Sequence, residues 1–116
     1  MEKLYIKILF GENMETLLKF IDAQYERLKK YYDCFDDEKF ALASMAKLSE
    51  EVGELSEVIL AKCMLQHKKK KEKKHDLPQE IADVLIVTLI IAKHMKVDVK
   101  KALEENIKNI EDLYKE

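Results

Sequence analysis

The strongest constraint on the fold is a helix-forming segment, residues 76–95, that is apolar almost all the way round. Between residues 84 and 92 only Thr88 is polar. A helix without a polar face is normally buried on every side. Yet Glu80 and Asp83 stand three residues apart at the head of the segment, and an ionised carboxylate beside apolar surface is costly unless something pairs with it. The sequence therefore predicts a buried helix that carries two carboxylates in need of a partner.

The rest of the chain also favours long helices. Its 116 residues include only two glycines and one proline, with 47% hydrophobic and 38% charged side chains. These are too few chain breakers for the many turns of an all-β domain. Apolar residues at helical spacing predict further helices at residues 14–33, 38–66 and 99–116. We expect a single all-α domain, residues 1–116, folded as a four-helix bundle. Since one small chain struggles to cover the helix at 76–95, a homodimer or homotetramer should complete it.

Several local features refine this picture. Aspartates mark the expected helix starts, at Asp36 or Asp37, at Asp76 and at Asp98. Residues 4–10, within an N-terminal segment 1–12, predict a short strand or an arm that Gly11 would end. Residues 67–76 predict a lysine-rich loop. An apolar stripe on the second helix is expected to face the core, formed by Ala41, Met45, Leu48, Val52, Leu55 and Ile59.

Charge and composition exclude some classes of function. The net charge is −2, although residues 67–75 carry six lysines against one glutamate. A mildly acidic body disfavours nucleic-acid binding. A nucleic-acid adaptor that binds through the lysine-rich loop is therefore the weakest of the three functional hypotheses considered below. No run approaches the roughly 20 apolar residues of a membrane span, and the N-terminus makes a poor signal peptide. Cys34 and Cys63 lack metal-ligand spacing and indicate reduced thiols in the core. We therefore expect a cytoplasmic protein that does not bind membranes.

Two pairs of carboxylates suggest a metal site. At 100° per residue, Glu51 and Glu54 lie on one flank of the stripe of the second helix, whereas Glu50 faces away. Glu80 and Asp83 repeat the same i, i+3 spacing, which places both members of a pair on one helix face. Two such pairs on neighbouring helices would repel each other, and a divalent cation would resolve the repulsion. All-oxygen ligands suit Mg²⁺, Mn²⁺ or Ca²⁺. The alternative is a solvated acidic face.

These residues match a known family pattern. The segment EEVGE, residues 50–54, is followed after 25 residues by EIAD, residues 80–83. This order resembles the E-E-x-x-E … E-x-x-D signature of the MazG-like nucleotide pyrophosphohydrolases, and the resemblance covers about residues 42–114. It implies Mg²⁺-dependent hydrolysis of a nucleoside or deoxynucleoside triphosphate to the monophosphate and pyrophosphate, with Mn²⁺ as a possible substitute. By match, the catalytic residues would be the metal ligands Glu51, Glu54, Glu80 and Asp83, with Glu50 as an accessory that orients water.

The resemblance also implies substrate contacts from a Lys, an Asn and an Arg-Tyr pair along the last helix. When the pattern is aligned on Tyr114, its Lys, Asn and Arg fall on Asn106, Ile110 and Leu113. Only Tyr114 therefore matches the family pattern. A different register would use Lys108 and Asn109. Lys47, on the carboxylate flank, could hold a phosphate or form a salt bridge with Glu51. The candidate substrate-binding residues are thus Lys47, Asn106, Lys108, Asn109 and Tyr114.

Two alternatives stay open at this point. One concerns an aromatic set that could form either a base-stacking surface or part of the core, namely Tyr25, Tyr31, Tyr32, Phe35 and Phe40. The other concerns function. A non-catalytic helical interaction module could keep the carboxylates as a structural metal site, whereas a pyrophosphohydrolase needs them open to solvent and phosphate.

Overall fold

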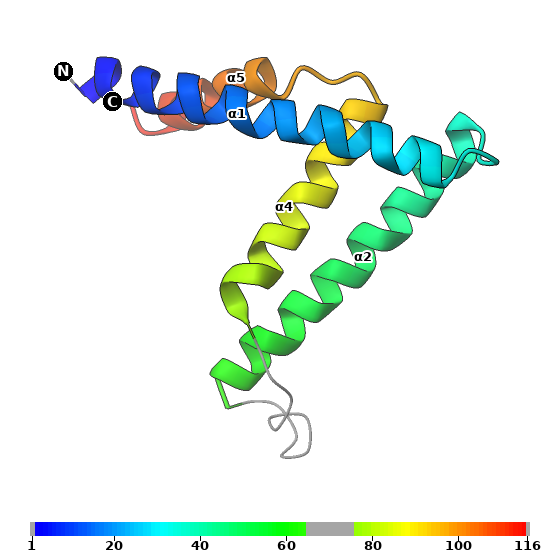
Figure 1. The fold of residues 1–116 in the computed structure, drawn as a ribbon. Helices are drawn as coiled ribbons and strands as arrows, with labels where there is room; N and C mark the ends of the chain where they lie inside the picture. Colours follow the sequence, from blue (N-terminus) through cyan, green and yellow to red (C-terminus); the bar gives the residue numbers. More distant parts are fainter. Residues whose placement is uncertain (1, 65–75, 116) are drawn as a thin grey trace.

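The computed structural model describes residues 2–64 and 76–115. Within these residues the chain forms four helices and no strand: α1 (Glu2–Tyr31), α2 (Asp37–Lys62), α4 (Leu77–His94) and α5 (Val99–Leu113) (Figure 1). The all-α class is confirmed. The expected lysine-rich loop at residues 67–76 lies, except for Asp76, outside the described residues.

Aspartate caps begin three of the helices. Asp36, Asp76 and Asp98 each accept a hydrogen bond from the backbone N–H three residues later, at 2.8 to 3.1 Å. Such caps satisfy one of the free N–H groups in the first turn of a helix. All three expected starts are confirmed, and Asp36 rather than Asp37 caps α2.

The N-terminal segment differs from the prediction. Residues 4–10 belong to α1 and are not a strand, and the helix continues through Gly11 without a break. A glycine inside a helix costs only about 1 kcal/mol relative to alanine. That is too little to end a helix of 30 residues, whose backbone hydrogen bonds continue on both sides.

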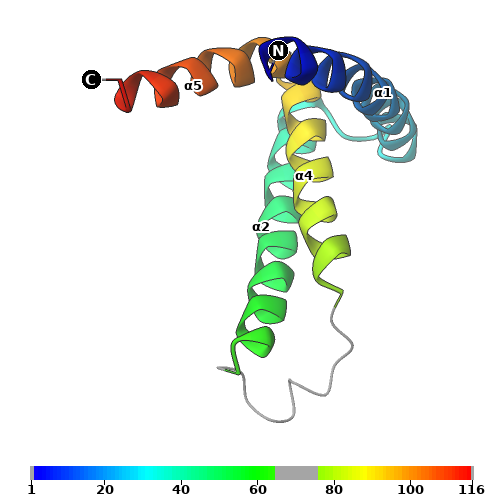
Figure 2. The same ribbon diagram turned by 90° about the vertical axis from the view of Figure 1, so that its left-hand side faces the viewer.

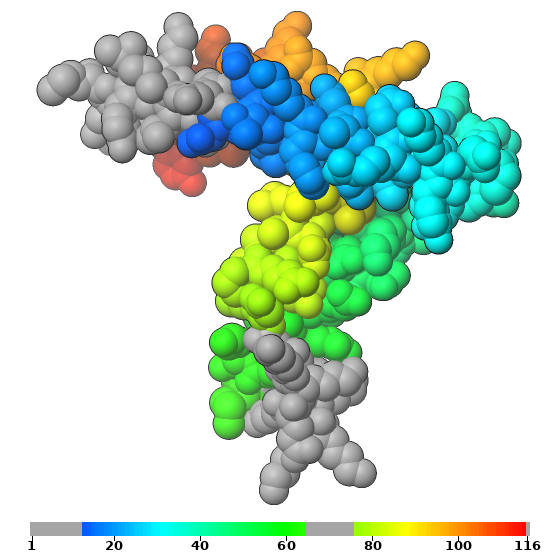
Figure 3. Space-filling view, viewed as in Figure 1, coloured from blue at the N-terminus to red at the C-terminus, as the bar shows by residue number. Residues whose placement is uncertain are grey.

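The core lies where three helices meet. α2 and α4 run antiparallel side by side, and α1 crosses one end of this pair (Figures 1 and 2). Ile21 of α1, Phe40 of α2 and Ile90 of α4 are each at most 4% exposed and pack together. His94 forms two hydrogen bonds at the same junction. Its ring nitrogens lie 2.8 Å from the Tyr25 hydroxyl and 2.8 Å from the Asp37 carbonyl oxygen. The far end of the α2–α4 pair is left uncovered by α1 (Figure 3).

The four helices do not close into a bundle within one chain. α5 extends away from the α2–α4 pair (Figure 2), and its apolar residues Leu103, Ile107 and Ile110 are 40–50% exposed. As expected for a helix that one small chain cannot cover, α4 is partly exposed, with Ile81 at 44% and Leu85 at 58%. Among the described helices, α1 and α2 are the two that cover it substantially. Completion of the bundle by a second copy stays a prediction.

The packed face of α2 is also different from the predicted stripe. Met45, Val52 and Ile59 are 44–50% exposed, whereas Glu51 and Val58 are buried. The face toward α4 is thus rotated by roughly 80° around the helix axis, at 100° per residue. This rotation moves Glu51 from the flank of the interface to its centre. None of the described helices is long and apolar enough to cross a membrane.

Candidate metal centre

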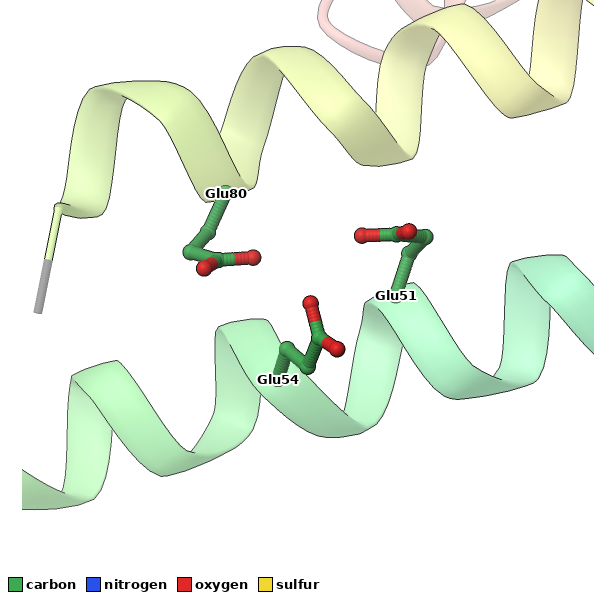
Figure 4. Close-up of side chains that lie close together, drawn as sticks. All are labelled: Glu51, Glu54 and Glu80. Atoms are coloured by element: carbon green, nitrogen blue, oxygen red, sulfur yellow. The ribbon is translucent and has the colours of Figure 1, made fainter.

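Three carboxylates meet between α2 and α4 at the end that α1 leaves open. Glu51 and Glu54 project from α2, and Glu80 projects toward them from the first turn of α4 (Figure 4). Each offers an oxygen that lies within 4.8 Å of the other two. The i, i+3 spacing places the two α2 side chains on one face, and the antiparallel packing of the helices brings Glu80 opposite them.

Two oxygens of this cluster are buried without a partner. Glu51 is only 6% exposed, and within the described residues neither its Oε2 nor Oε2 of Glu80 has a hydrogen-bond partner. Buried carboxylate oxygens are nearly always paired, because desolvating a charged oxygen without a new partner is costly. A divalent cation is the partner that this donor set fits, since Mg²⁺ and Mn²⁺ take carboxylate oxygens. Glu80 also gains some stabilisation from the N-terminal end of the α4 dipole.

Lys47 partly neutralises the cluster from one side. Its Nζ lies 3.0 Å from Oε1 of Glu51 and 3.4 Å from Oε1 of Glu50. The hydrogen bond to Glu51, with the attraction of both carboxylates, raises the pKa of the Lys47 ammonium despite an opposing effect of burial. Of the two roles open from the sequence, the structure contains the salt bridge. This bridge uses only one oxygen of Glu51 and leaves Oε2 free.

The repulsion within the cluster falls mainly on Glu54. The negative charge of Glu51 raises the pKa of the Glu54 carboxyl, and partial desolvation and the charges of Glu80 and Glu50 add to the rise. Raising an acid's pKa means that the protonated form is favoured. The folded chain therefore holds three acidic groups at a distance where positive charge between them would be stabilising.

The remaining candidate residues lie outside this cluster. Asp83 is half-buried on α4 but does not join the three carboxylates that lie within 4.8 Å of one another. Glu50 is exposed and pairs with Lys47, as expected for a residue that faces away. The other four predicted substrate contacts are exposed on α5 or at its C-terminal end, namely Asn106, Lys108, Asn109 and Tyr114. The structure thus brings together three of the four predicted ligands.

The family model of the MazG nucleotide pyrophosphohydrolase domain matches residues 41–115. The chain belongs to the MazG family. No curated protein and no solved structure matches it significantly. The matched part of this MazG chain contains nearly all of α2 and the whole of α4 and α5, whereas α1 precedes it.

The sequence did not indicate every residue beside the MazG carboxylates. Gln24 and Ser44 line a groove that adjoins the cluster, and neither was singled out as a candidate. For Ser44 a signal was present, because it stands seven residues before Glu51 and so two helical turns away on the same face. Gln24 lies on α1, and no local pattern connects it with α2. Of the aromatic set, Tyr32, Phe35 and the buried Phe40 line this groove, whereas Tyr31 is 78% exposed.

Proposed function

We propose that the protein is a Mg²⁺-dependent nucleoside triphosphate pyrophosphohydrolase that converts an NTP or dNTP to the monophosphate and pyrophosphate. The observation that carries this proposal is the pair of buried oxygens, Oε2 of Glu51 and Oε2 of Glu80, that lack a partner within the described residues. They belong to three converging carboxylates on helices within the matched MazG region. A purely structural cluster would satisfy such oxygens with protein donors.

Glu51, Glu54 and Glu80 would hold the cation, and Asp83 would join as the fourth ligand of the family pattern. Mg²⁺ usually keeps waters and phosphate oxygens in its coordination shell beside one or two carboxylates, and Mn²⁺ accepts the same oxygen ligands. When bound, the ion would neutralise charge on the phosphates and lower the pKa of a coordinated water.

The side chains around the cluster have complementary tasks in this proposal. Lys47 is about half-exposed, so its ammonium can keep Glu51 in place and donate a further hydrogen bond to a phosphate oxygen. Glu50 is exposed beside it and can accept a hydrogen bond from the attacking water. Neither role requires a side-chain nucleophile.

Substrate contacts from α5 would need an assembly of chains. Asn106, Lys108 and Asn109 lie on α5, and Tyr114 follows its last residue. The apolar residues of this helix are also exposed. We propose a homodimer or homotetramer in which these apolar residues are covered and α5 approaches a cluster. A cytoplasmic location fits Cys34 and Cys63, which are both free thiols. Both are exposed, so the prediction that they lie in the core is wrong.

The direct test is a panel of the common nucleoside and deoxynucleoside triphosphates, assayed for pyrophosphate release in Mg²⁺ and in EDTA. We expect release of pyrophosphate only with the metal. Glu51→Gln should lower kcat by about a hundredfold or more, the scale of one lost electrostatic contact in a transition state. Glu26→Gln is the matched control, because it makes the same change at an exposed position of α1. Metal binding without any pyrophosphate release would support the interaction module instead.

A further inference from the structure

Lys47 lies at the edge of the carboxylate cluster and contacts one of its members directly. Its Nζ is 3.0 Å from Oε1 of Glu51 and 3.4 Å from Oε1 of Glu50. The two partners differ in burial, because the Glu51 side chain is 8% exposed and the Glu50 side chain is 59% exposed. An ion pair with both members in solvent contributes little to stability, whereas the loss of a partner is costly for a buried charge. The contact with Glu51 is therefore the energetically important one.

Lys47 and the rest of the cluster approach Glu51 from opposite directions along α2. Lys47 stands four residues before Glu51, about 6 Å along the helix axis, and Glu54 stands three residues after it, about 4.5 Å along the axis. Glu51, Glu54 and Glu80 converge in the space between α2 and α4 (Figure 4). The ammonium pairs with Oε1 of Glu51, and Oε2, which has no hydrogen-bond partner among the described residues, remains for a cation in the cluster. Glu51 can thus be shared by two cations.

The balance of charge supports this division of Glu51. Among the described residues, Lys47 is the one cationic side chain that forms an ion pair with a member of the cluster. Three carboxylates within 4.8 Å of one another and one ammonium leave two net negative charges. A single divalent cation neutralises that charge. The ammonium therefore supplies part of the positive charge that the cluster needs, and the metal ion would supply the remainder.

An ammonium and a divalent ion that share one carboxylate also oppose each other. Both carry positive charge, so each reduces the electrostatic energy that the other gains from the cluster. This coupling is reciprocal, because the free energy by which the ammonium weakens metal binding equals the free energy by which bound metal weakens the contribution of the ammonium to stability. The ammonium is covalently attached and is also held by Glu50, so it is present at every metal concentration.

We propose that Lys47 is a built-in counter-cation of the cluster. Without a metal ion it stabilises the folded chain by pairing with the buried Glu51, and it makes the affinity for the ion lower than three carboxylates alone would give. The inference rests on the proposed function only in taking the cluster as the cation site, and it does not require hydrolysis. Its consequence is a chain that stays folded while the ion exchanges.

The first test is the affinity for the metal alone. Lys47→Met keeps the length of the side chain and removes its charge, and at a side chain that is 52% exposed it opens no cavity. Mn²⁺ is titrated into the metal-stripped full chain by isothermal calorimetry. It should bind Lys47→Met about tenfold more tightly than the parent, the scale of repulsion between an ammonium and a divalent ion a few ångströms apart. Lys47→Arg, which keeps the charge, should bind Mn²⁺ like the parent.

A matched control removes the same charge elsewhere on α2. Lys62 is exposed in the last turn of this helix, eight residues and about 12 Å along the axis beyond Glu54. That separation exceeds the screening length at physiological salt. Lys62→Met should therefore change the affinity for Mn²⁺ by less than about twofold.

The second test is stability with and without the metal. In denaturant melts, Lys47→Met should unfold at a lower midpoint than the parent in EDTA, and saturating Mn²⁺ should remove most of that deficit, as reciprocity demands. An ordinary surface ion pair predicts the same deficit in both conditions and an unchanged affinity for Mn²⁺, which would overturn the proposal. Weaker Mn²⁺ binding by Lys47→Met would also overturn it, because Lys47 would then only hold Glu51 in position.

The counter-cation and the hydrolase can fail separately. Binding of Mn²⁺ that depends on Glu54 but not on Lys47 would refute the counter-cation and leave the proposed function intact. Tighter binding by Lys47→Met, with no pyrophosphate release from any triphosphate, would support the counter-cation and refute the hydrolase. If the parent binds no Mn²⁺ at all, the cation site is wrong and both are refuted.

Discussion

Glu80→Gln should stabilise the metal-free protein and abolish most of its activity. Glu80 and Glu51 offer oxygens within 4.8 Å of each other. At that distance two unit charges repel by about 0.9 kcal/mol in water and about 3.5 kcal/mol at an effective dielectric constant of 20. Because Glu80 is half-buried and Lys47 already compensates Glu51, we expect a gain near the lower value, about 1 kcal/mol. That corresponds to a rise of about 4 °C in Tm. The new amide could also donate to the unpaired Oε2 of Glu51.

The same change removes a ligand. In Mg²⁺ the rate of pyrophosphate release should fall at least about a hundredfold, although the variant is folded. Denaturant melts in EDTA and the pyrophosphate assay in Mg²⁺ measure the two effects, with Glu26→Gln as the control for a lost charge. If Glu80 is instead held by the N-terminal amides of α4, the variant will be less stable without metal and nearly as active per folded molecule. That combination would refute the reasoning.

Three further predictions concern the same surfaces. Mg²⁺ or Mn²⁺ should raise the Tm, since a ligand that binds only the folded state stabilises it. Calorimetry should show no such rise in Glu54→Gln. A full rise in that variant would exclude Glu54 as a ligand. In EDTA, the pKa of the Glu54 carboxyl is higher in the folded chain than in the unfolded chain, where it is about 4.5. The protonated carboxyl therefore contributes stability below about pH 4.5, and this contribution is lost as the pH rises through the folded-state pKa. Chemical denaturation should therefore find Glu54→Gln more stable than the parent at pH 7, and the difference should vanish by about pH 4. Finally, light scattering at micromolar concentration should give the mass of at least a dimer. Leu85→Lys, at a 58% exposed position of α4, should lower that mass. A monomer mass for the unchanged chain would contradict the expected assembly.

Much of the fold follows from local patterns in the sequence. Capping aspartates and apolar spacing fixed the starts of α2, α4 and α5, because a cap involves only the residue and the backbone N–H groups that follow it. The N-terminal segment was predicted less well. The apolar run at residues 4–10 is compatible with either a strand or a helix, and short apolar runs cannot be distinguished by periodicity alone.

The carboxylates show where local inference ends. The i, i+3 spacing determined that Glu51 and Glu54 share one face of α2. The order of the two acidic motifs identified Glu80 as their partner, and all three residues lie within the matched region, residues 41–115. The spacing could not determine that Glu51 is buried at the centre of the interface or that Asp83 stays outside the group of three. Both depend on how far α2 and α4 are rotated about their own axes where they pack.

That rotation is a property of tertiary packing. α2 has apolar residues on adjoining sides, so its sequence allows more than one face to be buried. Ile21 of α1 and Ile90 of α4, which are distant in the sequence, pack against Phe40 and so select the face that carries Glu51. The groove arises in the same way, because Gln24, Ser44 and Ile86 come from three helices. The sequence by itself determined the helices and the acidic chemistry, and only the packing of α1, α2 and α4 decided which side chains meet.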